Sequence, residues 1–131
     1  MIVNWSIGVM KHKKSILVLD DDVKYKSLIE NLLTKNNEYK VLLASDGDRI
    51  LHTLEDKKGK IDLIVTDLIH PGMGGIELLH AIKEKYPAIK IIICTGLPML
   101  HDDFKQNSDS ILYKPFKFEN LLEVIKNTLN S

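Results

Sequence analysis

The chain has 131 residues, and its 18 basic and 18 acidic side chains give a formal net charge of zero. This length fits one ordinary domain with a single hydrophobic core. Without a net positive charge the chain has no global field to recruit nucleic acid or an anionic membrane, so neither is expected as a direct partner. Any function must come from a local site.

The single cysteine, Cys94, ends the apolar run Ile91-Ile92-Ile93-Cys94, which favours a buried structural thiol. One cysteine can form no disulfide within the chain, and this fits a reducing compartment, so we expect a cytoplasmic protein. No stretch approaches the roughly 18 apolar residues that a membrane-spanning helix needs. Membrane insertion is therefore not expected.

The first residues read as an extension of the domain. An apolar start, residues 1–10, precedes the basic residues 11–14, which reverses the charge order of a secretory signal. We predict that residues 1–13 form a flexible N-terminal extension and that residues 14–131 form one domain.

From residue 14 onward, short β-branched apolar runs alternate with segments whose apolar residues lie three and four apart. The predicted strands are Ser15 to Asp20, Tyr39 to Ala44, Asp62 to Thr66, Lys90 to Thr95 and Ile111 to Tyr113. Four helical stripes lie between and after them: Tyr25, Leu28, Ile29, Leu32 and Leu33; Ile50, Leu51 and Leu54; Leu78, Leu79 and Ile82; and Phe118, Leu121, Leu122, Ile125 and Leu129. Leu97 to Ser110 shows no clear stripe, so a short or irregular helix is expected there. Strands of continuous Ile, Leu and Val are covered on both faces, which predicts an α/β fold with a doubly wound, parallel, five-stranded sheet.

Polar residues stand at the carboxyl ends of these strands, where ligands of such folds bind. The first strand runs into Asp20-Asp21-Asp22, and the third, fourth and fifth lead to Asp67, Thr95 and Lys114. Acids clustered at the end of a buried strand are costly unless a cation or a proton compensates their charge. Singly, Thr95 could cap a turn, Lys114 could be solvated and Asp67 could cap a helix. Together at one rim they predict a functional site that holds a cation.

Over residues 14–130 the chain resembles the receiver domains of two-component response regulators. The resemblance rests on Ile16 to Asp22, Asp62 to Gly75, Ile93 to Gly96 and Tyr113 to Phe116. It implies the flavodoxin-like strand order 2-1-3-4-5. It also implies a phosphoacceptor, Asp67, a Mg²⁺ ion held by Asp20, Asp21 and Asp67, and phosphate contacts from Thr95 and Lys114. Asp22 matches a variable position and is given no metal-binding role.

The resemblance further implies a signalling protein without enzymatic turnover, apart from slow loss of its own phosphoryl group. The donor would be a histidine kinase or a histidine phosphotransfer protein, and the output a change in binding to a downstream protein. Because Ser131 follows closely on the last predicted helix, we expect a stand-alone receiver; weak homodimerisation stays open.

Two residues and one segment depart from the family pattern. Ile111, three residues before Lys114, stands where members commonly carry a Tyr or Phe that changes rotamer on activation. The segment from Thr95 to Lys114 is shorter than usual. Ile69 stands where some members place a residue that helps water attack, so slow dephosphorylation is expected; an aspartyl-phosphate phosphatase, which would carry a second acid there, is disfavoured. A receiver-like interaction module that does not respond to phosphate stays open as an alternative.

Overall fold

The computed structural model describes residues 13–20, 22–35, 38–67, 74–96 and 102–131. Within them, strands and helices alternate along the chain. The strands are β1 (Lys14–Leu19), β2 (Tyr39–Ala44), β3 (Leu63–Thr66), β4 (Lys90–Thr95) and β5 (Ser110–Tyr113). The helices are α2 (Val23–Thr34), α3 (Gly47–Asp56), α4 (Gly75–Lys85), α5 (Asp102–Gln106) and α6 (Phe118–Leu129).

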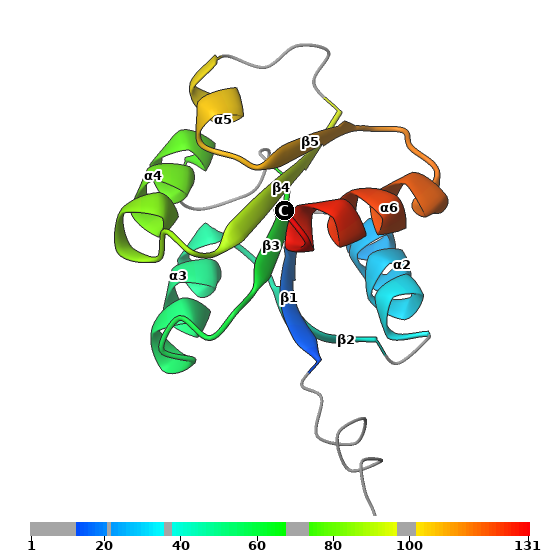
Figure 1. The fold of residues 1–131 in the computed structure, drawn as a ribbon, viewed down its shortest axis with the longest axis horizontal. Coiled ribbons are helices and arrows are strands. Elements are labelled where there is room, and N and C mark those ends of the chain that lie inside the picture. Colours follow the sequence, from blue (N-terminus) through cyan, green and yellow to red (C-terminus); the bar gives the residue numbers. More distant parts are fainter. Residues whose placement is uncertain (1–12, 21, 36–37, 68–73, 97–101) are drawn as a thin grey trace, which may run out of the picture.

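The strands form one parallel sheet in the order β2-β1-β3-β4-β5 (Figure 1). Each strand begins and ends within one residue of its predicted bounds. The doubly wound α/β fold and the flavodoxin-like strand order are therefore confirmed.

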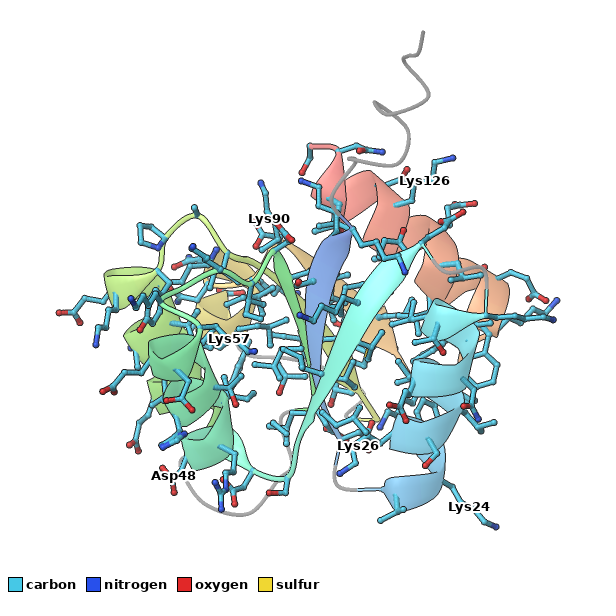
Figure 2. All side chains as sticks on the ribbon, turned by 90° about the horizontal axis from the view of Figure 1, so that it is seen from below. Lys24, Lys26, Asp48, Lys57, Lys90 and Lys126 are labelled. Atoms are coloured by element: carbon cyan, nitrogen blue, oxygen red, sulfur yellow. The ribbon has the colours of Figure 1, made fainter. Side chains whose placement is uncertain are left out.

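Helices cover both faces of this sheet, with α3, α4 and α5 on one side and α2 and α6 on the other (Figure 1). Alternate residues of β1 serve the two faces: Leu17 and Leu19 join the core beneath α3 and α4, whereas Ile16 and Val18 join the core beneath α2 and α6. All four are buried. Figure 2 shows side chains of the sheet and the helices filling both spaces. The continuous apolar strands arise because each strand must present an apolar side chain to both layers.

The predicted helical stripes face the core with one exception. Ile29 and Leu33 of α2 are buried, but Leu28 is 48% exposed. Leu28 was wrongly assigned to the buried stripe. A helix packed on a sheet hides only one side, and Leu28 lies beyond the edge of that side.

The helix before β5 is short, as expected. Helix α5 has five residues, and its Phe104 packs against the core of α3 and α4. The Asp109 carboxylate anchors the start of β5: its Oδ2 accepts hydrogen bonds from the Ile91 backbone N–H at 2.7 Å and from Lys83 Nζ at 3.2 Å. Ile111 packs partly buried on the same core.

The predicted extension falls mostly outside the described residues, since β1 begins at Lys14 and residues 1–12 are not described. In the described part of the chain, no helix combines the length and the hydropathy needed to cross a bilayer.

Candidate functional site

Strand register brings the predicted site residues to one rim of the sheet. Leu19 pairs with Thr66, so Asp20 and Asp67 follow two neighbouring strands at the same level. The ladder continues past the strand ends, because the Asp67 backbone N–H donates to the Leu19 carbonyl at 3.0 Å. Asp20 and Asp67 are both buried, at 3% and 9% exposure.

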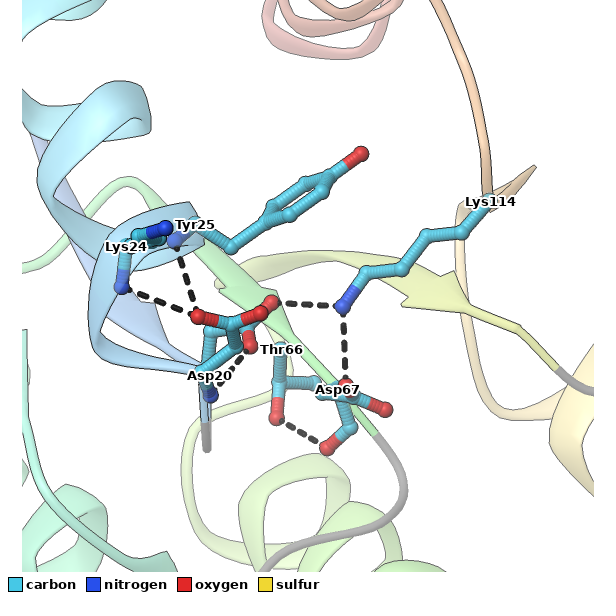
Figure 3. Close-up of polar contacts among 7 residues, drawn as sticks. Asp20, Lys24, Tyr25, Thr66, Asp67 and Lys114 are labelled. Carbon is cyan, nitrogen blue, oxygen red and sulfur yellow. Dashed lines mark hydrogen bonds and ion pairs between the residues drawn. The ribbon is translucent and has the colours of Figure 1, made fainter.

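Lys114 joins these two carboxylates. Its Nζ donates to Asp20 Oδ2 at 2.7 Å and to Asp67 Oδ2 at 2.9 Å (Figure 3). The lysine reaches them from the chain that follows β5, across the end of β4. Residues 20, 67 and 114, which are far apart in sequence, thus form one ionic cluster of two buried carboxylates and a partly buried lysine.

Two opposing effects act on the Lys114 ammonium. Burial disfavours the charged amine, but the hydrogen bonds and charges of Asp20 and Asp67 outweigh burial and raise the pKa of Lys114. Lys114 is therefore a stable cation at neutral pH. Among these three side chains, one positive charge faces two buried carboxylates.

The loop after β1 is organised by acidic side chains. The Asp22 backbone N–H donates to Asp20 Oδ1 at 2.9 Å, which orients the Asp20 carboxylate. Asp22 itself caps α2, with its Oδ1 accepting from the backbone N–H groups of Lys24 and Tyr25. Asp22, which was expected to have no metal-binding role, acts as the N-cap of α2. Asp21 lies outside the described residues, as do residues 68–73, which include Ile69.

Thr95 ends β4 at the same rim and is completely buried. Since Ile93 pairs with Thr66, Thr95 lies one residue beyond the level of Asp67. Its carbonyl accepts a hydrogen bond from the Lys114 backbone N–H at 2.7 Å, which ties the lysine's backbone to this strand. The Lys114–Pro115 peptide bond is cis.

An aromatic residue completes the surroundings of Lys114. The Lys114 Nζ lies 4.4 Å from the centroid of the Tyr25 ring, within the range of a cation–π contact. From the sequence, Tyr25 was expected only as a member of the apolar stripe of this helix.

The donor set suits a hard divalent cation. Mg²⁺ takes oxygen ligands and is usually held by one or two carboxylates together with water and phosphate oxygens. Asp20 and Asp67 offer two buried carboxylates that share the Lys114 ammonium. The described residues contain no group of three or more His, Cys, Asp or Glu side chains that could hold a metal ion. The third predicted ligand, Asp21, lies outside the described residues. The residues present therefore fit Mg²⁺ as a partial site.

Comparison with known proteins adds an independent line of identification. The family model described as the response regulator receiver domain matches residues 16–126. The chain belongs to this family. Receiver domains are signalling domains that interact with histidine kinases and with downstream effectors.

Two curated relatives differ in the share of their own length that matches this chain. This chain is 31% identical over 124 residues to the chemotaxis protein CheY of Bacillus subtilis. The match covers 92% of this chain and 100% of CheY. This chain is 33% identical over 121 residues to the probable transcriptional regulator ycf29 of Cyanophora paradoxa. That match covers 88% of this chain but only 56% of ycf29.

Solved structures agree with the fold. A response regulator receiver domain protein from Clostridium thermocellum is 30% identical, with a TM-score of 0.79 and coverage of 89% of this receiver and 94% of that chain. A response regulator protein from Thermotoga maritima, solved in complex with Mg²⁺ and BeF, is 29% identical, with a TM-score of 0.77 and coverage of 88% and 98%.

Proposed function

We propose that this receiver accepts a phosphoryl group on Asp67 from a histidine kinase or a histidine phosphotransfer protein, in a Mg²⁺-dependent reaction in the cytoplasm. Phosphorylation then switches its binding to a downstream protein. The observation that carries the proposal is the contact of the Lys114 ammonium with both Asp20 and Asp67, at 2.7 and 2.9 Å. It gathers a buried nucleophile, a metal-binding acid and a cation at the rim where ligands of this fold bind.

In the proposed reaction, an Asp67 carboxylate oxygen attacks the phosphorus atom. The new O–P bond forms as the P–N bond to the donor histidine breaks, and the electron pair leaves with the imidazole nitrogen, which takes up a proton. Both reactants are anionic, so their repulsion must be neutralised. Lys114 offers a charged donor to a phosphate oxygen, and Thr95 offers a hydroxyl donor. Mg²⁺, held by Asp20, Asp21 and Asp67, would supply further charge neutralisation between Asp67 and the phosphoryl oxygens.

The proposed output follows from the charge that phosphorylation adds. A phosphoryl group brings roughly −1.5 to −2 charges and three acceptor oxygens. Lys114 would then exchange a carboxylate partner for a phosphate oxygen, and Thr95 would be drawn toward the same group. Because Thr95 ends β4 and Lys114 directly follows β5, the surface formed around those strands would repack and alter partner affinity.

Acetyl phosphate provides a direct test, because it donates a phosphoryl group with acetate as the leaving group. We expect intact-mass analysis to show one added phosphoryl group on the wild type when Mg²⁺ is present, and none after chelation. Asp67→Asn should remove the added mass. Asp62→Asn is the matched control: Asp62 precedes β3 at the opposite end of the sheet, where it accepts a hydrogen bond from the Ser15 backbone N–H, and its substitution should leave labelling intact.

Two results would contradict this proposal. Absence of label on the folded wild type would favour a receiver-like interaction module that does not use phosphate. Label that survives Asp67→Asn would place the acceptor elsewhere.

A further inference from the structure

The Lys114 ammonium is enclosed on three sides by named groups. An ammonium carries three N–H donors. Two of them are engaged by Asp20 Oδ2 and Asp67 Oδ2, at 2.7 and 2.9 Å. The Tyr25 ring, with its centroid 4.4 Å from Nζ, takes a further side (Figure 3). The two carboxylates and the ring together define where the charge sits.

The ring that faces Lys114 is itself fixed by aromatic packing. The Tyr25 and Phe116 rings meet edge to face, with centroids 5.6 Å apart, and Phe118 lies 6.2 Å from Tyr25. Phe116 follows Lys114 by two residues, and Phe118 begins α6. Tyr25 stands in the first turn of α2, which Asp22 caps. The ring is thus held by α2 and by the chain that presents the lysine.

We infer that Tyr25 is a positioning residue for phosphorylation: the face of its ring holds the Lys114 ammonium between Asp20 and Asp67. This inference rests on the proposed function, because it assigns Tyr25 a part in the reaction at Asp67. The electron-rich ring face attracts the cation and covers it against water. It does not compete with the two carboxylates for the N–H donors of the ammonium.

A lysine needs such a support because its charge sits on a flexible four-carbon stem. The two carboxylates alone leave the ammonium free to rotate about the line between them and to take up water on its open side. The ring removes that freedom. Lys114 then starts the reaction close to the position in which it meets the incoming phosphoryl oxygens, which is the benefit of preorganised charge.

Three variants of the full-length chain test this inference. Tyr25→Phe keeps the ring, Tyr25→Leu replaces it with an apolar side chain, and Phe118→Leu removes a ring of the same cluster that has no cation–π contact with Lys114. Urea unfolding first establishes that each is folded. The rate of labelling by acetyl phosphate is then measured at saturating Mg²⁺. We expect Tyr25→Phe and Phe118→Leu to stay within about twofold of the wild type and Tyr25→Leu to be slower by about fivefold.

A spectroscopic readout separates positioning from a general structural role. The face of an aromatic ring shields protons held above it, so the ε-methylene protons of Lys114 should resonate upfield of ordinary lysine values in NMR spectra. That shift should persist in Tyr25→Phe and vanish in Tyr25→Leu.

The outcomes distinguish this inference from the proposed function. A wild type that takes no label overturns the proposed function. A wild type labelled at Asp67 whose rate is unchanged by Tyr25→Leu, or reduced equally by Phe118→Leu, overturns only the role of Tyr25. So does a Lys114 resonance without the upfield shift, and so does failure of Tyr25→Phe to retain the wild-type rate.

Discussion

At the scale of single residues, charge balance governs the site. Asp20 and Asp67 are buried carboxylates, and Lys114 is their shared cation. Removing one member of such a buried cluster leaves the others without compensation, which costs more than the loss of one contact. The proposed Mg²⁺ would add a second cation to this cluster of two carboxylates and one ammonium.

Cys94 gives a residue-scale prediction about the core beside the site. Burial raises the pKa of the Cys94 thiol to about 12 from an ordinary 9.0. In the unfolded chain the thiol ionises near its ordinary pKa, so between about pH 9 and 12 its contribution to stability falls as pH rises. At pH 8 we expect iodoacetamide to modify Cys94 in the folded protein at least about a hundredfold more slowly than in urea. Equal rates, measured by mass spectrometry, would show an accessible thiol and contradict this burial.

Some residues of the site could be predicted from the sequence and others could not. Asp20, Asp67, Thr95 and Lys114 could be found because each stands at a strand end, and parallel strands align those ends. The contact between Tyr25 and Lys114 could not be predicted. It depends on the rotation of α2 about its axis and on how closely the chain after β5 approaches that helix. A stripe of apolar residues defines a helix face, but not which member meets a lysine from another segment.

At the scale of elements, two helices begin with side-chain caps near the rim. Asp22 caps α2, and Asp46 caps α3 by accepting from the Arg49 backbone N–H at 2.8 Å. Such caps satisfy backbone donors that the first helical turn leaves unpaired. The cap on α2 also fixes the turn that carries Tyr25.

Asp22→Ala should lower the free energy of unfolding by about 1 kcal/mol, because it removes the N-cap of α2. Asp46→Ala is the matched control and should cost a similar amount through α3. Urea denaturation measures both. Neither substitution should reduce the final extent of Mg²⁺-dependent labelling of the folded protein. Loss of labelling in Asp22→Ala alone would mean that Asp22 takes part in the metal site and not only in the cap.

Element prediction was strongest where the sequence pattern was longest. Strands β2 and β4 match their predicted bounds, since each contains an uninterrupted run of four apolar residues, Val41 to Ala44 and Ile91 to Cys94. Helix α5 is a single turn with no buried residue, so the sequence has no apolar stripe from which this helix could be predicted. Its position depends on side-chain anchors such as Asp109, whose partners Lys83 and Ile91 lie on other elements.

At the scale of the whole molecule, one sheet separates two cores and gathers the ends of its strands at a single rim. Continuous Ile, Leu and Val in the strands predicted the two covered faces, because each face requires alternate residues. The order of the strands was not contained in that periodicity. It came from the resemblance to receiver domains and is confirmed by the pairing of β1 with both β2 and β3.

The position of the phosphoryl group is the central claim, and chemical trapping tests it most directly. Borohydride reduces an acyl phosphate, so a phosphorylated aspartate becomes homoserine, which peptide mass mapping can locate. After treatment with acetyl phosphate and Mg²⁺, we predict homoserine at position 67 and unreduced aspartate at positions 20 and 62. Homoserine at another position, or at none in a folded sample, would contradict the assignment of Asp67 as the phosphoacceptor.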